Sequence, residues 1–130
     1  IAKTEGVYED MRFRDEISKL EVDIVALEML VLRVLSAEKS GKNSLDIAGL
    51  LKIRGSEIQQ RYTELMMLAA GPFSLPFIFE AMDAGWQGDF PGHEVSNAPL
   101  AANYFNMRKT TIYGGSNEVQ RNIVAQVVLG

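Results

Sequence analysis

A short glycine-rich stretch near the end of the chain carries the residues best suited to hold a ligand. Gly114 and Gly115 are followed by Ser116, Asn117 and Glu118, where a last helix is predicted to begin. Glycine permits backbone torsions that are closed to other residues, and it lets a ligand approach closely. The first N–H groups of a helix lack partners and carry the positive end of its dipole. The stretch therefore predicts either a site for an anion or cofactor, or an ordinary corner between helices.

Other residues that could do chemistry fit structural roles better. Glu57 and Glu64 lie seven positions apart on one helix face, but no Glu-x-x-His motif accompanies them, so we interpret them as solvent-facing. His93, the single histidine, is interpreted as polar loop surface. The segment "SAEKSGK" lacks the spacing of a phosphate-binding loop and is interpreted as a linker. No metal site is expected.

Composition is typical of a globular domain and excludes several functions. The chain has 130 residues, of which 47% are hydrophobic and 23% charged, with 13 basic and 17 acidic residues and a net charge of −4. No basic stripe is present, which disfavours nucleic acid or an anionic membrane as a partner. The absence of cysteine excludes disulfides, iron–sulfur clusters and thiol catalysis. No apolar run approaches the roughly 20 residues of a membrane span and no secretory signal is visible, so we expect a cytoplasmic protein.

The spacing of apolar residues predicts an all-α fold, an up-and-down helical bundle, whose first helix covers about residues 10–39. One face of this helix has steps of three and four between Ile17, Leu20, Ile24, Leu27, Val31 and Val34. A second apolar set is formed by Val22, Val25, Met29, Leu30 and Leu32. A helix that is apolar on two sides is buried on both, either at the centre of a bundle or at a subunit interface.

A second helix is predicted over about residues 45–68, between a turn and a Gly-Pro break. Gly41 suits the preceding C-cap and Ser44 the N-cap. Its inner stripe is expected to contain Ile47, Leu51, Ile58, Tyr62, Leu65 and Ala69. Gly55 interrupts this stripe, which predicts close approach by a neighbouring helix.

The rest of the chain predicts shorter elements. We expect a helical piece over 73–83, an irregular stretch over 84–99, and a helix over about 100–110. Ser116 is a good N-cap for a last helix, with Val119, Ile123 and Val127 on one face.

The final nineteen residues, "IYGGSNEVQRNIVAQVVLG", resemble the C-terminal signature of acyl-CoA dehydrogenases, in which Ile-Tyr-x-Gly-(Thr/Ser)-x-(Glu/Gln)-(Ile/Val)-Gln-Arg precedes the last helix. The segment "LKIRGSEIQQRYTEL" resembles the second bundle helix of one bacterial branch of that family. The order of the elements agrees over essentially the whole chain.

The resemblance implies a fold, a reaction and partners. Residues 1–130 would be the C-terminal four-helix bundle domain without its opening helix, and without the N-terminal helical and β-barrel domains; the start at Ile1 fits a fragment. The family oxidises the Cα–Cβ bond of an acyl-CoA thioester to the enoyl-CoA, with hydride transfer to FAD and electrons passing to an electron-transfer flavoprotein. Its bundle lies at the centre of a homotetramer, a dimer of dimers. The alternatives are an acyl-CoA oxidase and a non-catalytic bundle used for subunit assembly.

Carried over by position, the signature implies five cofactor-binding residues, namely Tyr113, Gly114, Gly115, Ser116 and Glu118. Arg121 matches the signature arginine, for which we expect a structural role. Two family motifs depart from the pattern. Arg-x-x-Phe-Gly is absent before the first helix, and Gln-x-Leu-Gly-Gly appears as "MLAAG", which keeps only Gly71. In the family, contacts to the cofactor's pyrophosphate and adenine are made across a subunit interface. Because these two motifs are absent or altered here, the resemblance does not carry those contacts over to this chain.

The resemblance also implies that this chain contains no catalytic residue. Many family members place a glutamate base directly after the signature tyrosine, where this sequence has Gly114. Glu118 lies one helical turn further on, at a position used for the flavin, so we reject it as the base. Other members carry the base on the helix that opens the domain, and we expect a glutamate there, upstream of Ile1.

Overall fold

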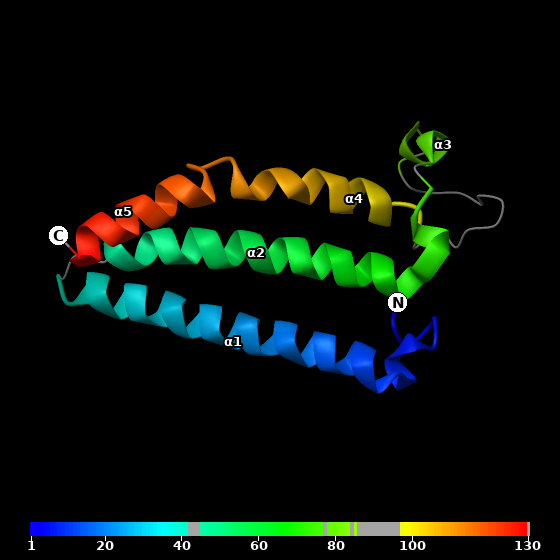
Figure 1. Ribbon diagram of the computed structural model, residues 1–130, viewed down its shortest axis with the longest axis horizontal. Helices are drawn as coiled ribbons and strands as arrows, with labels where there is room; N and C mark the ends of the chain where they lie inside the picture. Colours follow the sequence, from blue (N-terminus) through cyan, green and yellow to red (C-terminus); the bar gives the residue numbers. More distant parts are fainter. Residues whose placement is uncertain (42–44, 77, 84, 86–96, 130) are drawn as a thin grey trace. The chain divides into compact units, whose positions relative to one another are not determined.

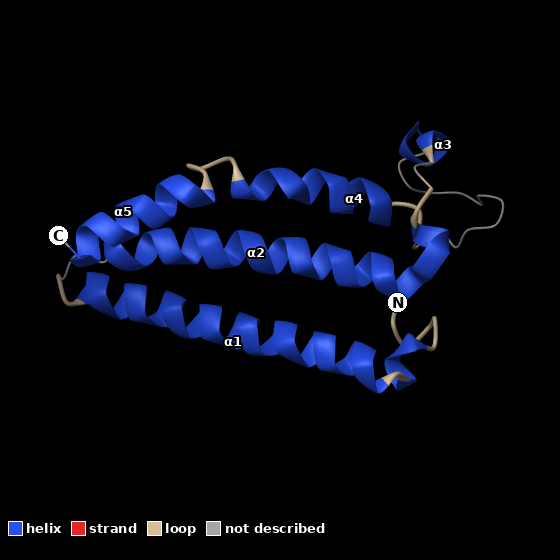
Figure 2. Ribbon diagram, in the orientation of Figure 1, coloured by secondary structure: helices blue, strands red, loops and turns tan. Residues whose placement is uncertain are grey.

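The computed structural model describes residues 1–41, 45–76, 78–83, 85 and 97–129. Every regular element among these residues is helical, which confirms the all-α prediction (Figure 2). The α-helices are α1 (Met11–Lys39), α2 (Leu45–Ala70), α3 (Phe79–Asp83), α4 (Leu100–Met107) and α5 (Asn117–Leu129). Short 3₁₀ turns cover Val7–Glu9, Gly71–Ser74 and Arg108–Thr111.

The chain divides into two compact units. The first unit contains Ile1–Ser18 and Gln60–Arg108, and the second contains Lys19–Gln59 and Lys109–Gly130. The two long helices, α1 and α2, each contribute residues to both units.

In the first unit, polar contacts fix α4 against the second half of α2. Gln60 donates from Nε2 to the backbone oxygens of Met107 and Arg108 at 3.2 and 3.1 Å. Arg108 returns a bond from Nη2 to the Gln60 oxygen at 2.8 Å. Arg61 pairs with Glu64 on its own helix and with Glu16 of α1. The buried apolar residues of this unit are Leu65, Ala69, Ala70, Ala81, Ala98, Leu100 and Ala101.

In the second unit, α5 lies beside the first half of α2 (Figure 1). Arg54 of α2 pairs with Asp23 of α1 and with Glu57 on its own helix. Glu57 also accepts a bond from Arg121 of α5 at 3.0 Å. This chain of ion pairs connects three helices, and it gives Arg121 the structural contact expected of the signature arginine.

Most helix boundaries agree with the sequence patterns, and one element does not. Gly41 follows α1 with a φ of 69°, as a C-cap requires, whereas Ser44 lies outside the described residues. The short helical piece expected over 73–83 is confirmed in α3, but it is shorter than expected, and a 3₁₀ turn covers the start of that range. Pro76 lies in the break between this turn and α3 and has no N–H, so it cannot donate the backbone bond that a continuous helix would make there. The irregular stretch expected over 84–99 falls largely outside the described residues.

The helix faces that the chain itself covers differ from those expected. On α1, Leu20 is buried, while Ile24 and Val31 of the same stripe are exposed. Tyr62, expected on the inner stripe of α2, is 53% exposed. On α5, the expected stripe of Val119, Ile123 and Val127 faces outward, and the more buried positions are Asn117, Gln120 and Val124.

The glycine at which two helices approach closely is Gly49 and not Gly55. A β-carbon added to Gly55 would meet nothing within 4 Å. A β-carbon on Gly49 would lie 2.7 Å from Cγ2 of Val124. Both glycines lie in α2, six positions apart, so they point in different directions around the helix.

Candidate functional site

The Gly114-Gly115 segment forms a tight turn in front of α5. Both residues have left-handed torsions, with φ of 69° and 82°. Gln120 of α5 reaches back and donates from Nε2 to the Gly114 oxygen at 2.9 Å. A β-carbon on Gly115 would lie 2.8 Å from that same Nε2. The backbone torsion therefore favours glycine at position 115, and any larger residue would also displace the end of the Gln120 side chain.

Ser116 caps the last helix, as its position in the sequence predicts. Its Oγ accepts a long bond from the Val119 N–H at 3.4 Å, and its backbone oxygen accepts the first helical bond from Gln120 at 2.9 Å. Satisfying otherwise unpaired N–H groups in this way stabilises a helix end by about 1 kcal/mol.

The carboxylate of Glu118 already occupies the positive end of α5. The backbone N–H of Glu118 lowers the pKa of its own carboxyl group, and the Ser116 hydroxyl and the charges of Arg121 and Lys52 act in the same direction. An anionic ligand would have to displace this carboxylate, so the exposed turn suits an uncharged polar part of a ligand better than a second anion.

Beneath the turn, a polar cluster links α5 to α2. Asn117, the first residue of α5, is only 3% exposed. Its Oδ1 accepts a bond from Lys52 Nζ at 2.7 Å, and its Nδ2 donates to Ser56 Oγ at 3.1 Å. No sequence pattern assigned Lys52 a role. Its partner lies 65 positions later, and no local pattern indicates such a contact.

A hollow of about 270 Å³ opens beside the turn. It is lined by Leu51, Lys52, Gly55, Ser56, Gln59, Thr110, Tyr113 and Gly114. The free space above Gly55 is part of this hollow, so this glycine keeps the α2 side of the hollow open. The hollow thus brings the signature residues Tyr113 and Gly114 together with α2.

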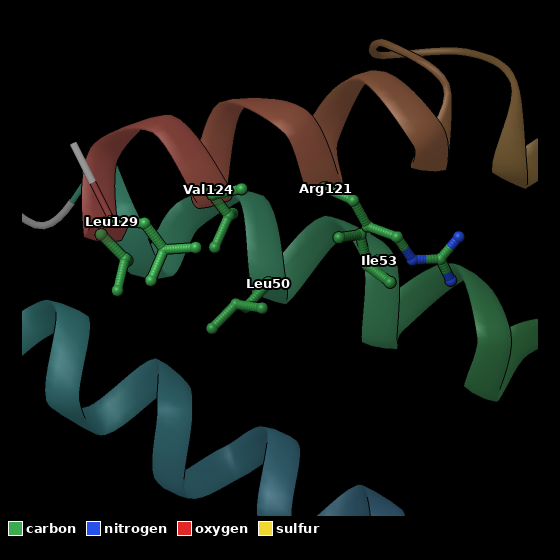
Figure 3. A pocket seen from close by; sticks show the side chains of 7 residues that line it. Leu50, Ile53, Arg121, Val124 and Leu129 are labelled. Atoms are coloured by element: carbon green, nitrogen blue, oxygen red, sulfur yellow. The ribbon is translucent and has the colours of Figure 1, made fainter.

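A second hollow, of about 370 Å³, lies between α2 and α5 and has a different character (Figure 3). Its lining is apolar apart from one residue, Arg121, whose side chain points away from Leu129 and pairs with Glu57. With its one polar group engaged in an ion pair, this hollow offers a ligand no group that could take part in chemistry.

The structure places the five predicted cofactor-binding residues on one short segment. Tyr113, Gly114, Gly115 and Glu118 are exposed, and Ser116 is half-buried. Glu57 and Glu64 are not free surface carboxylates, because each pairs with arginine. His93 lies outside the described residues.

The described residues contain neither a candidate metal site nor a candidate membrane span. No group of three or more histidine, aspartate or glutamate side chains is placed to hold a metal ion in the part of the chain that the structure covers. Nor does any described helix have the length and apolar character needed to cross a membrane.

Comparison with known proteins identifies the family. The model of the family described as "Acyl-CoA dehydrogenase, C-terminal domain" matches residues 2–129. Acyl-CoA dehydrogenase IpdE1 of Mycolicibacterium smegmatis is 27% identical over 130 residues, which cover 100% of this chain and 28% of that relative. No solved structure matches. The chain belongs to the family of acyl-CoA dehydrogenase C-terminal domains.

Proposed function

We propose that this chain is the C-terminal domain of an FAD-dependent acyl-CoA dehydrogenase that oxidises the Cα–Cβ bond of an acyl-CoA to the enoyl-CoA. The observation that carries the proposal is the family match over residues 2–129, which includes the turn in front of α5. The chain spans 28% of the length of its relative. This supports an arrangement in which an opening helix, an N-terminal helical domain and a β-barrel belong to the same enzyme but lie outside these residues.

The residues of the turn fit a flavin in two respects. Gly114 and Gly115 are exposed and carry no side chain, so a planar ring system can approach the backbone. Glu118 already provides the negative charge at the helix end, which leaves Ser116 and the glycine backbone for uncharged polar groups. Bound FAD would supply the acceptor for the hydride that leaves the β-carbon.

In this proposal, the chain's own residues bind and orient the cofactor and do not react. Ser116 contributes a hydroxyl at the edge of the turn, and Tyr113 forms one wall of the hollow beside it. Glu118 is a poor candidate for the base, because a carboxyl group with a lowered pKa takes up a proton less readily. We assign the base to a glutamate on the helix upstream of Ile1.

The electron acceptor and the assembly follow from the same proposal. An electron-transfer flavoprotein would reoxidise the flavin, and the enzyme would be a homotetramer built as a dimer of dimers. Exposed apolar residues on two helices of the second unit support self-association: Val22, Val25, Met29 and Leu32 on α1, and Val119, Ile123 and Val127 on α5.

The test is to purify the intact protein and record its absorption spectrum. We expect a yellow protein whose flavin is bleached by acyl-CoAs, assayed as a panel under anaerobic conditions. Reoxidation by an electron-transfer flavoprotein, with little reaction with oxygen, supports a dehydrogenase. Rapid reoxidation by oxygen alone with release of hydrogen peroxide identifies an oxidase.

A second candidate is a non-catalytic bundle used for subunit assembly. The observation that favours it is the apolar stripe of α1, which the described residues of this chain leave exposed. In that case the intact protein is an oligomer that is colourless and stays so after incubation with FAD. A flavin-containing oligomer contradicts this second candidate.

A further inference from the structure

Lys52 is placed to act on the turn although it lies in the middle of α2. Its Nζ donates to Oδ1 of Asn117 at 2.7 Å. Its Cε lies 4.0 Å from the position that a β-carbon on Gly114 would occupy. The side chain thus passes beneath the turn and ends on the first residue of α5.

The side-chain amide of Asn117 has two possible orientations, and the contacts to Lys52 and Ser56 favour one of them. An ammonium group only donates, so it must face the amide oxygen. The Ser56 hydroxyl has a single proton, and its shorter contact is to the Ile53 oxygen, at 2.8 Å. Ser56 Oγ then serves as the acceptor for Asn117 Nδ2 at 3.1 Å. Ser56 Oγ also lies 3.2 Å from Asn117 Oδ1, but its one proton makes the shorter contact to Ile53. Lys52, at 2.7 Å, is therefore the main donor to the buried amide oxygen of Asn117.

Fixing Asn117 also fixes the backbone next to it. Ser116 directly precedes Asn117 and provides both the cap of α5 and the proposed flavin contact. The bond between Gln120 and Gly114 holds the other side of the turn. We propose that Lys52 is a positioning residue for the flavin, holding the Gly114–Ser116 turn in its binding geometry through Asn117.

This inference rests on the proposed function, but it has a readout that needs no flavin. If Lys52 holds the helix start, its removal must loosen the amides of Val119 and Gln120, which bond to Ser116. Hydrogen exchange of these amides in the flavin-free protein measures that directly. The FAD affinity of the Lys52 variants then shows whether the geometry of the turn contributes to cofactor binding.

The experiment compares four variants of the intact protein. Lys52→Met keeps the length of the side chain and removes the donor, whereas Lys52→Arg keeps both charge and donors. Asn117→Ala removes the acceptor. Lys109→Met is the matched control, because it deletes the same charge from an exposed lysine of the same unit.

We expect Lys52→Met to speed exchange at Val119 and Gln120 and to weaken FAD binding, each by about tenfold, as loss of one charged hydrogen bond predicts. Lys52→Arg should keep most of the exchange protection and most of the FAD affinity. Lys109→Met should change neither quantity. Because Lys52 acts through Asn117, adding Lys52→Met to Asn117→Ala should have little further effect.

Three results would overturn the proposal: unchanged exchange in Lys52→Met, faster exchange with unchanged FAD affinity, or fully additive effects of the two substitutions. If the unmodified protein binds no FAD, the proposed function fails and the flavin role of Lys52 fails with it. The exchange data then show separately whether Lys52 holds the start of the helix.

Discussion

A β-carbon built on Gly49 would lie 2.7 Å from Cγ2 of Val124, so α2 and α5 pack closely at a position where only glycine fits. Valine is stiff about χ1 and cannot turn aside freely. The Gln120 side chain lies close on the same side, with Oε1 at 3.2 Å from the added carbon. The contact positions α5, and the turn that precedes it, on α2.

Gly49→Ala should therefore destabilise the protein. Overpacking of this kind costs about 1–3 kcal/mol. The gain in helix propensity, about 1 kcal/mol, offsets only part of that cost. The measurement is the free energy of unfolding from urea denaturation of the purified protein.

Gly55→Ala is the matched control, because it makes the same change in the same helix where nothing lies within 4 Å. It should stabilise the protein by about 0.5–1 kcal/mol through helix propensity alone. Equal stability of the two variants would show that α2 and α5 do not approach at Gly49.

These two glycines illustrate what the sequence could and could not predict. Steps of three and four between apolar residues predicted the long helices, and a serine after two glycines predicted the cap of α5. Both kinds of signal are local. Helix propensity treats Gly49 and Gly55 alike, so only the packing partner, Val124, distinguishes them.

The sequence alone did not predict which helix faces are buried within this chain, because burial depends on the packing partner. Apolar spacing shows that a face avoids water, but not whether the same chain or another subunit covers it. The stripe of Val119, Ile123 and Val127 lies on one face of α5, as its spacing predicted, but this chain leaves that face exposed. Lys52 was missed because a lysine on a helix is usually solvated, and its contact with Asn117 depends on the fold.

The second prediction concerns the space at Gly115. Gly115→Val should abolish flavin retention in the intact protein, because a branched side chain does not fit the φ of 82° and would occupy the space through which the cofactor approaches the turn. It would also displace the Gln120 side chain, whose Nε2 lies 2.8 Å from the added carbon. The measurement is the ratio of flavin to protein absorbance after gel filtration.

Gly6→Val provides the control for backbone strain. Gly6 has a similar φ of 75°, but a β-carbon there would meet nothing within 4 Å. This variant should lose about 1–2 kcal/mol of stability and keep its flavin. Full flavin occupancy in Gly115→Val would rule out a close approach of the cofactor to the turn.

The third prediction concerns the exposed stripe of α1. Met29 is 52% exposed between Val25 and Leu32, which are also exposed. Met29→Glu should lower the oligomeric state, since burying an unpaired carboxylate in an apolar interface costs several kcal/mol. Light scattering coupled to gel filtration measures the mass. Glu38→Lys changes the charge at an exposed position on the other side of α1 and should leave the mass unchanged. An unchanged mass for Met29→Glu would show that this stripe is not an interface.

The last prediction concerns Glu118, the carboxylate nearest to the turn. Its pKa in the folded protein is lowered, first by its own backbone N–H and then by the Ser116 hydroxyl. A lowered pKa means that the ionised form stabilises the fold. That contribution is present above the ordinary value of 4.5 and is lost as the pH falls through the folded pKa. The stability difference between the unmodified protein and Glu118→Gln should therefore be present at neutral pH and disappear in acid, as measured by denaturation at several pH values.

Replacing Glu118 and replacing the upstream glutamate should have different effects on cofactor binding and on proton transfer. Because Glu118 is assigned to the flavin side of the site, Glu118→Gln should weaken FAD binding, while the flavin-loaded fraction still turns over. Replacing the upstream glutamate should do the reverse, leaving flavin bound and removing turnover, because abstraction of the α-proton requires a positioned base. Rapid-reaction measurement of flavin reduction by acyl-CoA distinguishes the two variants. If Glu118→Gln retains flavin but cannot be reduced, and the upstream replacement is harmless, then the base lies at Glu118 and the assignment is wrong.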